Sequence, residues 1–183
     1  MKKVFFLGLT IVLSLAACQK QEKRYTQQSP EIDTYKSVIA AYEKHDWEAL
    51  ASHYADTAKI LNNVTMKDAQ TIDQLVAMDK DDATHFSTWK YDPKSVEYEM
   101  VVTDKGETWV NFWGHWEATL LVNSKTYVIP AHITARFIDG KIVREDGYWD
   151  LSKLMLDLQA LQETDKSTAE ESKMDKGTTP EKQ

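Results

Sequence analysis

The stretch TWVNFWGHWEATLLVNSKTYVIPAHITARF, residues 108–137, decides the fold of this chain. Apolar and polar residues alternate along both of its halves, which is the pattern of β-strands that bury one face. Asn123-Ser124 lies between the halves and suits a two-residue hairpin turn. Such a turn sets Val122 opposite Lys125, and the other pairs follow by counting outward. The stretch therefore predicts a long antiparallel hairpin.

This register assigns the side chains of the hairpin to two faces. One face is apolar and pairs Val110 with Phe137, Phe112 with Ala135, Gly114 with Ile133, and Trp116 with Ala131. The other face is mixed and carries Trp109, Asn111 opposite Arg136, Trp113 opposite Thr134, and His115 opposite His132, with Glu117 two residues from His115. A one-residue slip would exchange the faces, so the consistent sorting supports the alternation. We expect the apolar face to meet the helices.

The pattern outside the hairpin completes one domain. Alternation predicts strands at residues 96–102 and 142–149, which the turn sequences Asp104-Lys105-Gly106 and Asp139-Gly140 join to the hairpin. Apolar residues at helical spacing predict helices at residues 35–42, 47–54, 69–78 and 151–161, and residues 86–93 are interpreted as a loop. Helices followed by an antiparallel meander predict an α+β fold whose helices cover one face of the sheet.

The first residues indicate export. Lys2 and Lys3 precede an apolar run that is too short to span a bilayer, so residues 1–17 are predicted to be a signal peptide. Leu15-Ala16-Ala17-Cys18 resembles the bacterial lipobox, in which the cysteine receives fatty acids such as palmitate and becomes the first residue of the mature chain. The alternative is an ordinary cleaved signal with an accidental cysteine. Gln19 favours, by the same resemblance, the outer membrane of the cell envelope.

Composition divides the remaining chain into three parts. Residues 18–31 are polar and predict a lipid-anchored tether, residues 32–162 form a single domain, and residues 163–183 are predicted to be a disordered, charged tail. Without the signal peptide the chain keeps 20 basic and 29 acidic residues, a net charge of −9. Such an acidic chain repels phosphate backbones, which argues against nucleic acid as a partner. Cys18 is the only cysteine, so no disulfide within the chain is possible.

Several short motifs carry a family resemblance. They are the helix break His45-Asp46-Trp47-Glu48-Ala49-Leu50, the run Tyr54-Ala55-Asp56-Thr57-Ala58, and Arg136-Phe137-Ile138-Asp139-Gly140-Lys141-Ile142. Together with the element order, they resemble the SnoaL-like branch of the nuclear transport factor 2-like superfamily over residues 32–161. The resemblance implies a cone, in which a curved antiparallel sheet wraps around N-terminal helices and a pocket opens at the wide end. Members include cyclases, isomerases, hydrolases and binding proteins, so the fold does not name an activity.

The resemblance also indicates which positions correspond to catalytic residues in branches of that family. The position of the ketosteroid isomerase base falls on Asn62, whose amide cannot accept the proton, and the positions of the oxyanion-hole donors fall on Val38 and Ile133. SnoaL-type cyclases use an aspartate without a cofactor. Asp146 and Asp150 are the candidates here, with Tyr42, Tyr148 or His53 as possible partners. Asp150 precedes a helix, however, and N-capping explains it without chemistry.

The mixed face of the hairpin supports two readings. His115 opposite His132, with Glu117 nearby, can hold a transition metal or sense pH. Alternatively, Trp109 and Trp113 form a surface that packs against a second subunit, as the exposed sheet face often does in this superfamily. Pro130 lies in the same strand and can mark a bulge that breaks the histidine pair. We favour the homodimer interface.

The inner face predicts a pocket for a small molecule. Its predicted lining is largely aromatic, a composition that suits a flat or apolar ligand: Tyr42, Phe86, Trp89, Phe112, Trp116, Ile129, Ile133 and Tyr148. The alternative is that these residues only fill the core. No cofactor is expected. The sequence favours a lipid-anchored envelope protein that binds a small molecule without catalysis; the alternatives are a cofactor-independent lyase, cyclase or hydrolase and a homodimeric interaction scaffold.

Overall fold

The computed structural model describes residues 24–175. Within these residues the chain forms seven strands and four α-helices, with two short 3-10 turns, η1 (Met66–Asp68) and η2 (Ala83–His85). The predicted signal peptide, Cys18 and residues 176–183 lie outside the described residues. None of the helices within residues 24–175 has the length and apolar character needed to cross a membrane.

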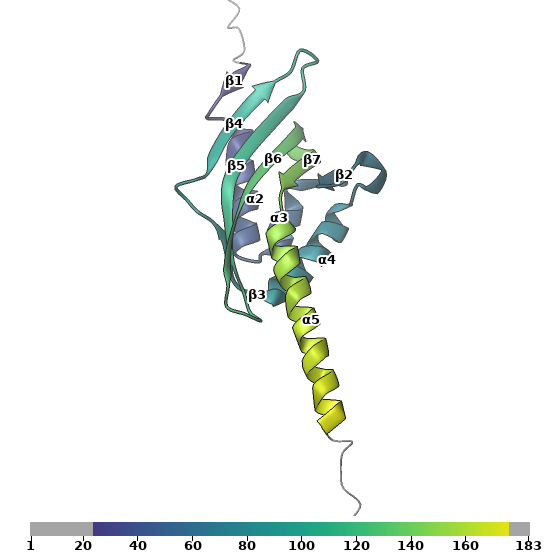
Figure 1. The fold of residues 1–183 in the computed structure, drawn as a ribbon. Coiled ribbons are helices and arrows are strands. Elements are labelled where there is room, and N and C mark those ends of the chain that lie inside the picture. The colour runs from purple at the N-terminus through teal and green to yellow at the C-terminus, as the bar shows by residue number, and fades with distance from the viewer. Residues whose placement is uncertain (1–23, 176–183) are drawn as a thin grey trace, which may run out of the picture.

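The strands form one curved sheet (Figure 1). Its order is β1 (Tyr25–Thr26), β4 (Glu97–Val102), β5 (Thr108–Leu120), β6 (Thr126–Ile138), β7 (Lys141–Trp149) and β2 (Tyr54–Asn62), and β3 (Phe86–Tyr91) also pairs with β5. The pairs are antiparallel except β2 with β7, which run parallel. The fold is therefore α+β, as predicted, although the sheet is not wholly antiparallel.

The helices gather on one side of the sheet. They are α2 (Pro30–Glu43), α3 (Trp47–Ser52), α4 (Ile72–Asp82) and α5 (Ser152–Asp175). Figure 1 shows the sheet curving around α2 and α3, with α4 beside them and α5 running away from the sheet as a rod. Ile32 and Tyr35 of α2 are almost fully buried against Phe112 and Val110 of β5, so the apolar face of the hairpin meets the helices as expected.

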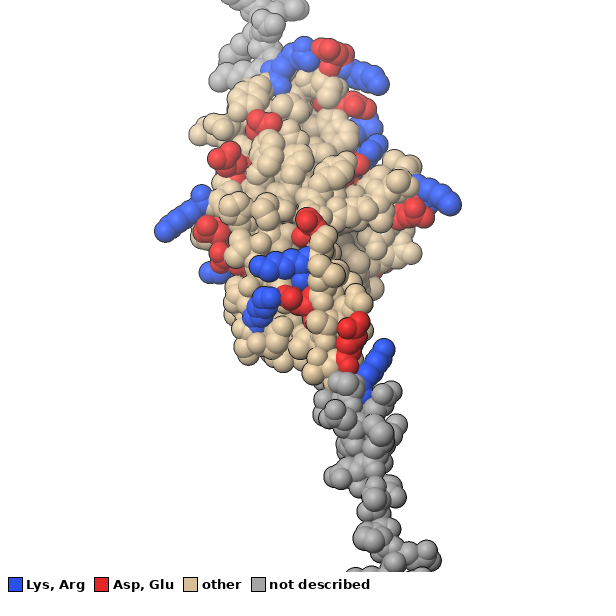
Figure 2. All heavy atoms as spheres, in the orientation of Figure 1, with Lys and Arg blue, Asp and Glu red and all other residues tan. Residues whose placement is uncertain are grey.

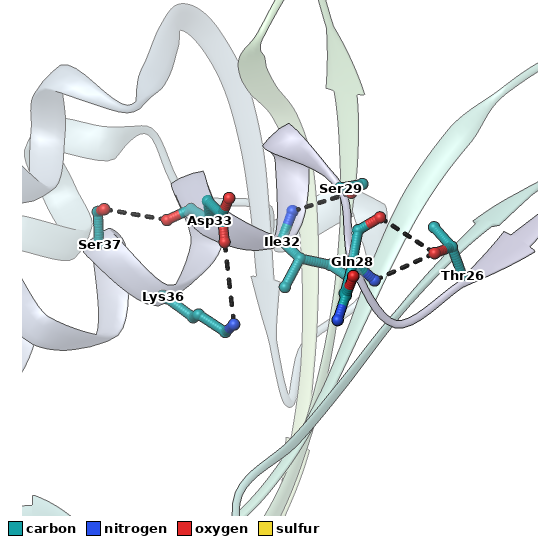
Figure 3. Close-up of polar contacts among 7 residues, drawn as sticks. All are labelled: Thr26, Gln28, Ser29, Ile32, Asp33, Lys36 and Ser37. Carbon is teal, nitrogen blue, oxygen red and sulfur yellow. Dashed lines mark hydrogen bonds and ion pairs between the residues drawn. The ribbon is translucent and has the colours of Figure 1, made fainter.

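The chain enters α2 through a structured turn, shown in Figure 3. The Ser29 hydroxyl accepts a hydrogen bond from the amide of Ile32 at 3.2 Å, and Pro30 occupies the first helical position. The Thr26 hydroxyl donates to the carbonyl of Gln28 and accepts from its amide. Since β1 also pairs with β4, the part of the predicted tether from residue 24 onward belongs to the folded domain.

The hairpin register differs from the predicted one. Its loop is longer, because the amide of Leu120 bonds to the carbonyl of Lys125 at 3.0 Å and closes the hairpin before residue 121. Each pair therefore shifts by two residues, so that Trp113 faces His132 and His115 faces Pro130. A shift of two leaves every side chain on its predicted face, since the strand repeat is two residues.

Three other predicted elements are corrected. Residues 86–91, interpreted as a loop, form β3, in which Trp89 and Tyr91 are buried against β5. Tyr54, placed in a helix, begins β2. The last helix continues to Asp175, so residues 163–175 of the predicted disordered tail are helical.

Charged side chains of both signs are distributed over the visible surface. Figure 2 shows Lys and Arg lying among Asp and Glu, around a broad uncharged area, rather than in a separate stripe. The face shown in Figure 2 is therefore mixed in charge.

Candidate functional site

A cavity of about 770 Å³ lies between the sheet and the helices. Residues from α2, α4 and α5 form one side of it, and residues from β2, β3, β5, β6 and β7 form the other. Its size is in the range of pockets that bind small organic molecules. The cavity is therefore the candidate functional site.

Glu145 of β7 is the least exposed of the acids that line this cavity. Its side chain is 4% exposed, and one carboxylate oxygen, Oε2, accepts hydrogen bonds from the hydroxyls of Tyr54 at 2.6 Å and Tyr35 at 3.1 Å. Burial raises the pKa of Glu145, and the two hydroxyl donors oppose that shift because they stabilise the carboxylate. The acid is thus held in a fixed position by α2 and β2.

Asp79 of α4 is a second buried acid in the cavity, and it is unpaired. Its side chain is 7% exposed, yet it has no hydrogen bond or ion pair with any residue of the described chain. Burial, followed by the nearby charges of Asp82 and Glu145, raises the pKa of Asp79 to about 7. Asp79 therefore changes its charge near neutral pH, inside the cavity.

Aromatic rings form one wall. Tyr42 stacks on Trp89 with ring centroids 4.5 Å apart, and the Trp89 indole nitrogen donates to the carbonyl of Tyr42 at 3.2 Å. Trp116 packs against Trp89 at 6.3 Å and edge-on against Phe86 at 5.3 Å. The indole N–H of Trp116 is buried and makes no hydrogen bond of good geometry within the described chain, although it is close enough to the Tyr42 hydroxyl to act on the pKa of that hydroxyl. It can therefore donate a hydrogen bond to a ligand in the cavity.

The mouth of the cavity is apolar. Five exposed hydrophobic side chains line it, and they come from the loop after β2, from α4, from the β5–β6 loop and from α5: Val64, Met78, Leu121, Val122 and Met155. Exposed apolar groups that surround an opening are typical of sites that bind another molecule.

Helix α5 closes one side of this mouth and is fixed to the hairpin. Leu154 packs with Leu120, Tyr127 and Ile129 in a small core of its own. Asp157 accepts a hydrogen bond from the Tyr127 hydroxyl at 2.9 Å and forms an ion pair with Lys125. These contacts position Leu151, Leu158 and Gln162 along the cavity.

Most of the predicted pocket residues line the cavity. They are Tyr42, Phe86, Trp89, Trp116, Ile129 and Ile133. Phe112 instead lies wholly in the core, where Tyr91 packs edge-on against it. Tyr148 is also misplaced, since it is 56% exposed on the opposite face of the sheet. The positions that correspond to the base and the oxyanion-hole donors of ketosteroid isomerases also line the cavity; they are Asn62, Val38 and Ile133.

The predicted catalytic aspartates lie outside the cavity. Asp146 is buried in a two-pronged ion pair with Arg144, at 2.7 and 2.8 Å. Asp150 is exposed and accepts hydrogen bonds from the amide and hydroxyl of Ser152 at the start of α5, which lower the pKa of its carboxyl. His53 ends α3 and does not line the cavity either. Asp150 therefore serves the end of the helix rather than the cavity.

A bulge explains the misplacement of Asp146 and Tyr148. Phe137 pairs with Ile142, but Arg136 pairs with Arg144, so Val143 is an extra residue in β7. The extra residue reverses the alternation for the rest of the strand. Glu145 consequently turns inward and Asp146 outward, the opposite of what counting from Ile142 indicates. Asp79 had a clearer signal, because it continues the buried stripe of Ile72 and Leu75 at helical spacing.

The predicted histidine pair on the outer face does not form. His132 lies opposite Trp113, on whose ring it stacks at 4.9 Å, and its Nδ1 is 3.1 Å from the carbonyl oxygen of Phe112. His115 pairs with Pro130 and Glu117 with Val128. Within residues 24–175, no group of three or more His, Cys, Asp or Glu side chains is placed to hold a metal ion.

Comparison with known proteins agrees with this geometry. Residues 35–145 match the family described as the SnoaL-like domain. The chain belongs to the SnoaL-like family, and its fold is that of the nuclear transport factor 2-like proteins. No curated protein matches the sequence.

Several solved structures share the fold. A SnoaL-like candidate polyketide cyclase from Shewanella denitrificans is 15% identical, with a TM-score of 0.56 over 73% of this chain and 99% of its own. IdmH from Streptomyces antibioticus, also a candidate polyketide cyclase, is 16% identical, with a TM-score of 0.56 over 72% and 99%. An NTF2-like protein of unknown function from Burkholderia pseudomallei is 14% identical, with a TM-score of 0.56 over 70% and 96%.

Proposed function

We propose that this chain is a lipid-anchored envelope protein whose SnoaL-like domain binds a small apolar or aromatic molecule. One observation carries the binding role: a cavity of about 770 Å³ with an aromatic wall and an exposed apolar mouth. Among the polar groups of its lining, Glu145, Asp79 and the Trp116 N–H are buried deeply enough to orient a ligand. Simple core filling would leave no such space.

The binding role can be tested with the neutral fluorescent probe N-phenyl-1-naphthylamine. We expect saturable, one-to-one binding by the soluble domain. Ala131→Trp places an indole in the cavity and should weaken the binding, because Ala131 is part of the lining. The matched control is Val128→Trp, since Val128 of the same strand is exposed and does not line the cavity. Equal affinity in both variants would reject the cavity as the binding site.

Asp79 favours a second candidate function, cofactor-independent acid–base catalysis. A carboxyl group with a pKa of about 7 can both take up and release a proton near neutral pH. This candidate replaces Asp146 and Asp150 as the acid or base of a lyase, cyclase or hydrolase, since neither lines the cavity. Once a bound compound is identified, turnover that survives Asp79→Asn would reject this candidate.

The anchor is proposed from the sequence alone. Leu15-Ala16-Ala17-Cys18 supports lipidation at Cys18, and Gln19 supports placement in the outer membrane. Labelling cells with a palmitate analogue should mark the full chain but not its Cys18→Ala variant, and the wild type should fractionate with the outer membrane. A Cys18→Ala variant that stays labelled would contradict the assignment.

We also propose a homodimer through the outer face of the sheet. The supporting feature is an exposed aromatic group in which Trp113, His132 and Tyr148 stack in sequence. Trp109 lies on the same face, with the Arg144 guanidinium 5.9 Å from its ring. Sedimentation should show a dimer that Trp113→Glu disperses while binding of the neutral probe persists. A wild-type monomer at high concentration would reject the dimer.

A further inference from the structure

We propose that the cavity selects an organic cation, in which a positively charged nitrogen carries an apolar body. The charged nitrogen would lie between the carboxylate of Asp79 and the rings of Tyr42 and Trp89. This inference rests on the binding role proposed above and specifies the class of ligand.

The charged residues that line the cavity are mostly acidic. Four acids contribute to the lining from three regions of the chain: Asp68, Asp79, Asp82 and Glu145. Among the described residues that line the cavity there is no Lys or Arg, and His85 is the single group that can carry a positive charge. His85 is exposed, and it lies 4.0 Å from Asp81, an acid that does not line the cavity. An anionic ligand would therefore meet repulsion in the cavity, whereas a cation would be attracted.

The two buried acids of the cavity, Glu145 and Asp79, differ in their hydrogen-bond partners. Glu145 is satisfied by the hydroxyls of Tyr35 and Tyr54. Asp79 has no partner within the described chain although it is 93% buried, since only 7% of it is exposed. Burying a charge without a partner is unfavourable, and a buried counter-ion removes most of that penalty. A bound cation would supply this counter-ion, which a neutral apolar ligand cannot do.

The aromatic wall provides the second half of the recognition. Tyr42 and Trp89 stack on each other, and Tyr91 and Trp116 adjoin them. Burial is the main cause that raises the pKa of the Tyr42 and Tyr91 hydroxyls, and the charge of the nearby Asp79 adds to both shifts. Ring faces attract cations, most strongly where water is excluded. A carboxylate beside a cluster of electron-rich rings is thus suited to an ammonium group with alkyl or aryl substituents.

Matched probes of equal shape test the charge preference. Benzyltrimethylammonium carries a permanent positive charge, and neopentylbenzene is its neutral carbon isostere. Both are titrated as displacers of N-phenyl-1-naphthylamine from the wild-type domain at about pH 8, where Asp79, with a pKa of about 7, is mostly ionised. We expect the cation to bind about tenfold more tightly than the isostere, or better. Phenylacetate, an anion, should bind more weakly than both.

Variants of α4 assign the preference to Asp79. In Asp79→Asn the ratio of cation to isostere affinity should fall towards one, and in Asp79→Glu, which keeps the charge, the preference should persist. The control is Asp73→Asn on the exposed side of the same helix, where the ratio should match the wild type.

The experiment distinguishes failure of the cation inference from failure of the proposed binding role. If the neutral probe binds but the cation shows no preference, or if the preference survives Asp79→Asn, the cation inference is overturned and the binding role stands. If neither the neutral probe nor any displacer binds the wild type in direct calorimetry, the binding role falls together with the inference.

Discussion

Asp79→Asn should change how the stability of the domain depends on pH. In the folded protein Asp79 has a pKa of about 7, compared with an ordinary value of 3.8. Below the ordinary value both folded and unfolded chains carry the proton, so the raised pKa has no effect on stability. Between the two values only the unfolded chain releases it, which favours unfolding. Wild-type stability is thus lost as the pH rises through this window, and the loss is complete above the folded pKa.

The magnitude follows from the size of the shift. Each pH unit in the window is worth about 1.4 kcal/mol, so the window from pH 3.8 to about 7 removes about 4 kcal/mol from the free energy of unfolding. An asparagine has the same shape and does not titrate. The variant should therefore match or slightly trail the wild type near pH 4, and gain relative to it by about 4 kcal/mol by pH 8.

Urea unfolding at several pH values measures this difference directly. The quantity of interest is the difference between the variant and the wild type, because other titrating groups such as Glu145 affect both proteins. Asp73→Asn, on the exposed side of α4, is the control and should run parallel to the wild type. A difference for Asp79→Asn that stays constant from about pH 4 to 8 would refute the assignment of Asp79 as a buried, unpaired acid.

Three further substitutions test the site and its surroundings. Tyr54→Phe removes the shorter of the two hydroxyl bonds to Glu145, and should lower the unfolding free energy by about 1–3 kcal/mol, measured in urea. Gly114→Ala places a methyl group 2.7 Å from the buried ring of Phe112, and should lower it by about 1–3 kcal/mol; an unchanged melting curve would contradict that packing. Asp150→Asn should lower the melting temperature slightly and leave the affinity for N-phenyl-1-naphthylamine unchanged, whereas a lost affinity would return Asp150 to the site.

The fold was predictable because the periodicity of the apolar residues identifies its main strands and helices even where the predicted register is wrong. The hairpin loop was predicted two residues too short, yet Trp116 and Ile133 kept their inward faces, since a shift of two preserves alternation. The helices α2 and α4 were likewise marked by buried residues at helical spacing. β3 was missed because its apolar residues Phe86, Trp89 and Tyr91 do not alternate regularly, and six residues are too few to separate a strand from a loop.

The polar part of the site was not predictable in the same way. Glu145 turns inward only because of the extra residue in β7, and a bulge has no reliable mark in a single sequence. That one residue moved Asp146 from the expected pocket to an ion pair with Arg144. An error that shifts a strand by two residues keeps each side chain on its face, although it changes the partner across the strand, as it did for His132. An error of one residue exchanges the faces and with them the chemistry of the site.

The unpaired polar groups of the cavity give the strongest argument that the cavity binds a ligand. Buried polar atoms are nearly always hydrogen-bonded, because leaving one unpaired costs about 1–3 kcal/mol. Yet the Trp116 N–H and the Asn62 side-chain oxygen are buried on one cavity without a hydrogen bond of good geometry in the described chain. If these residues served only to pack the interior, an apolar residue at either position would avoid the cost of the unpaired polar atom. Two such atoms around one space, beside the unpaired carboxyl of Asp79 that titrates near pH 7, are explained by a ligand that supplies the missing bonds.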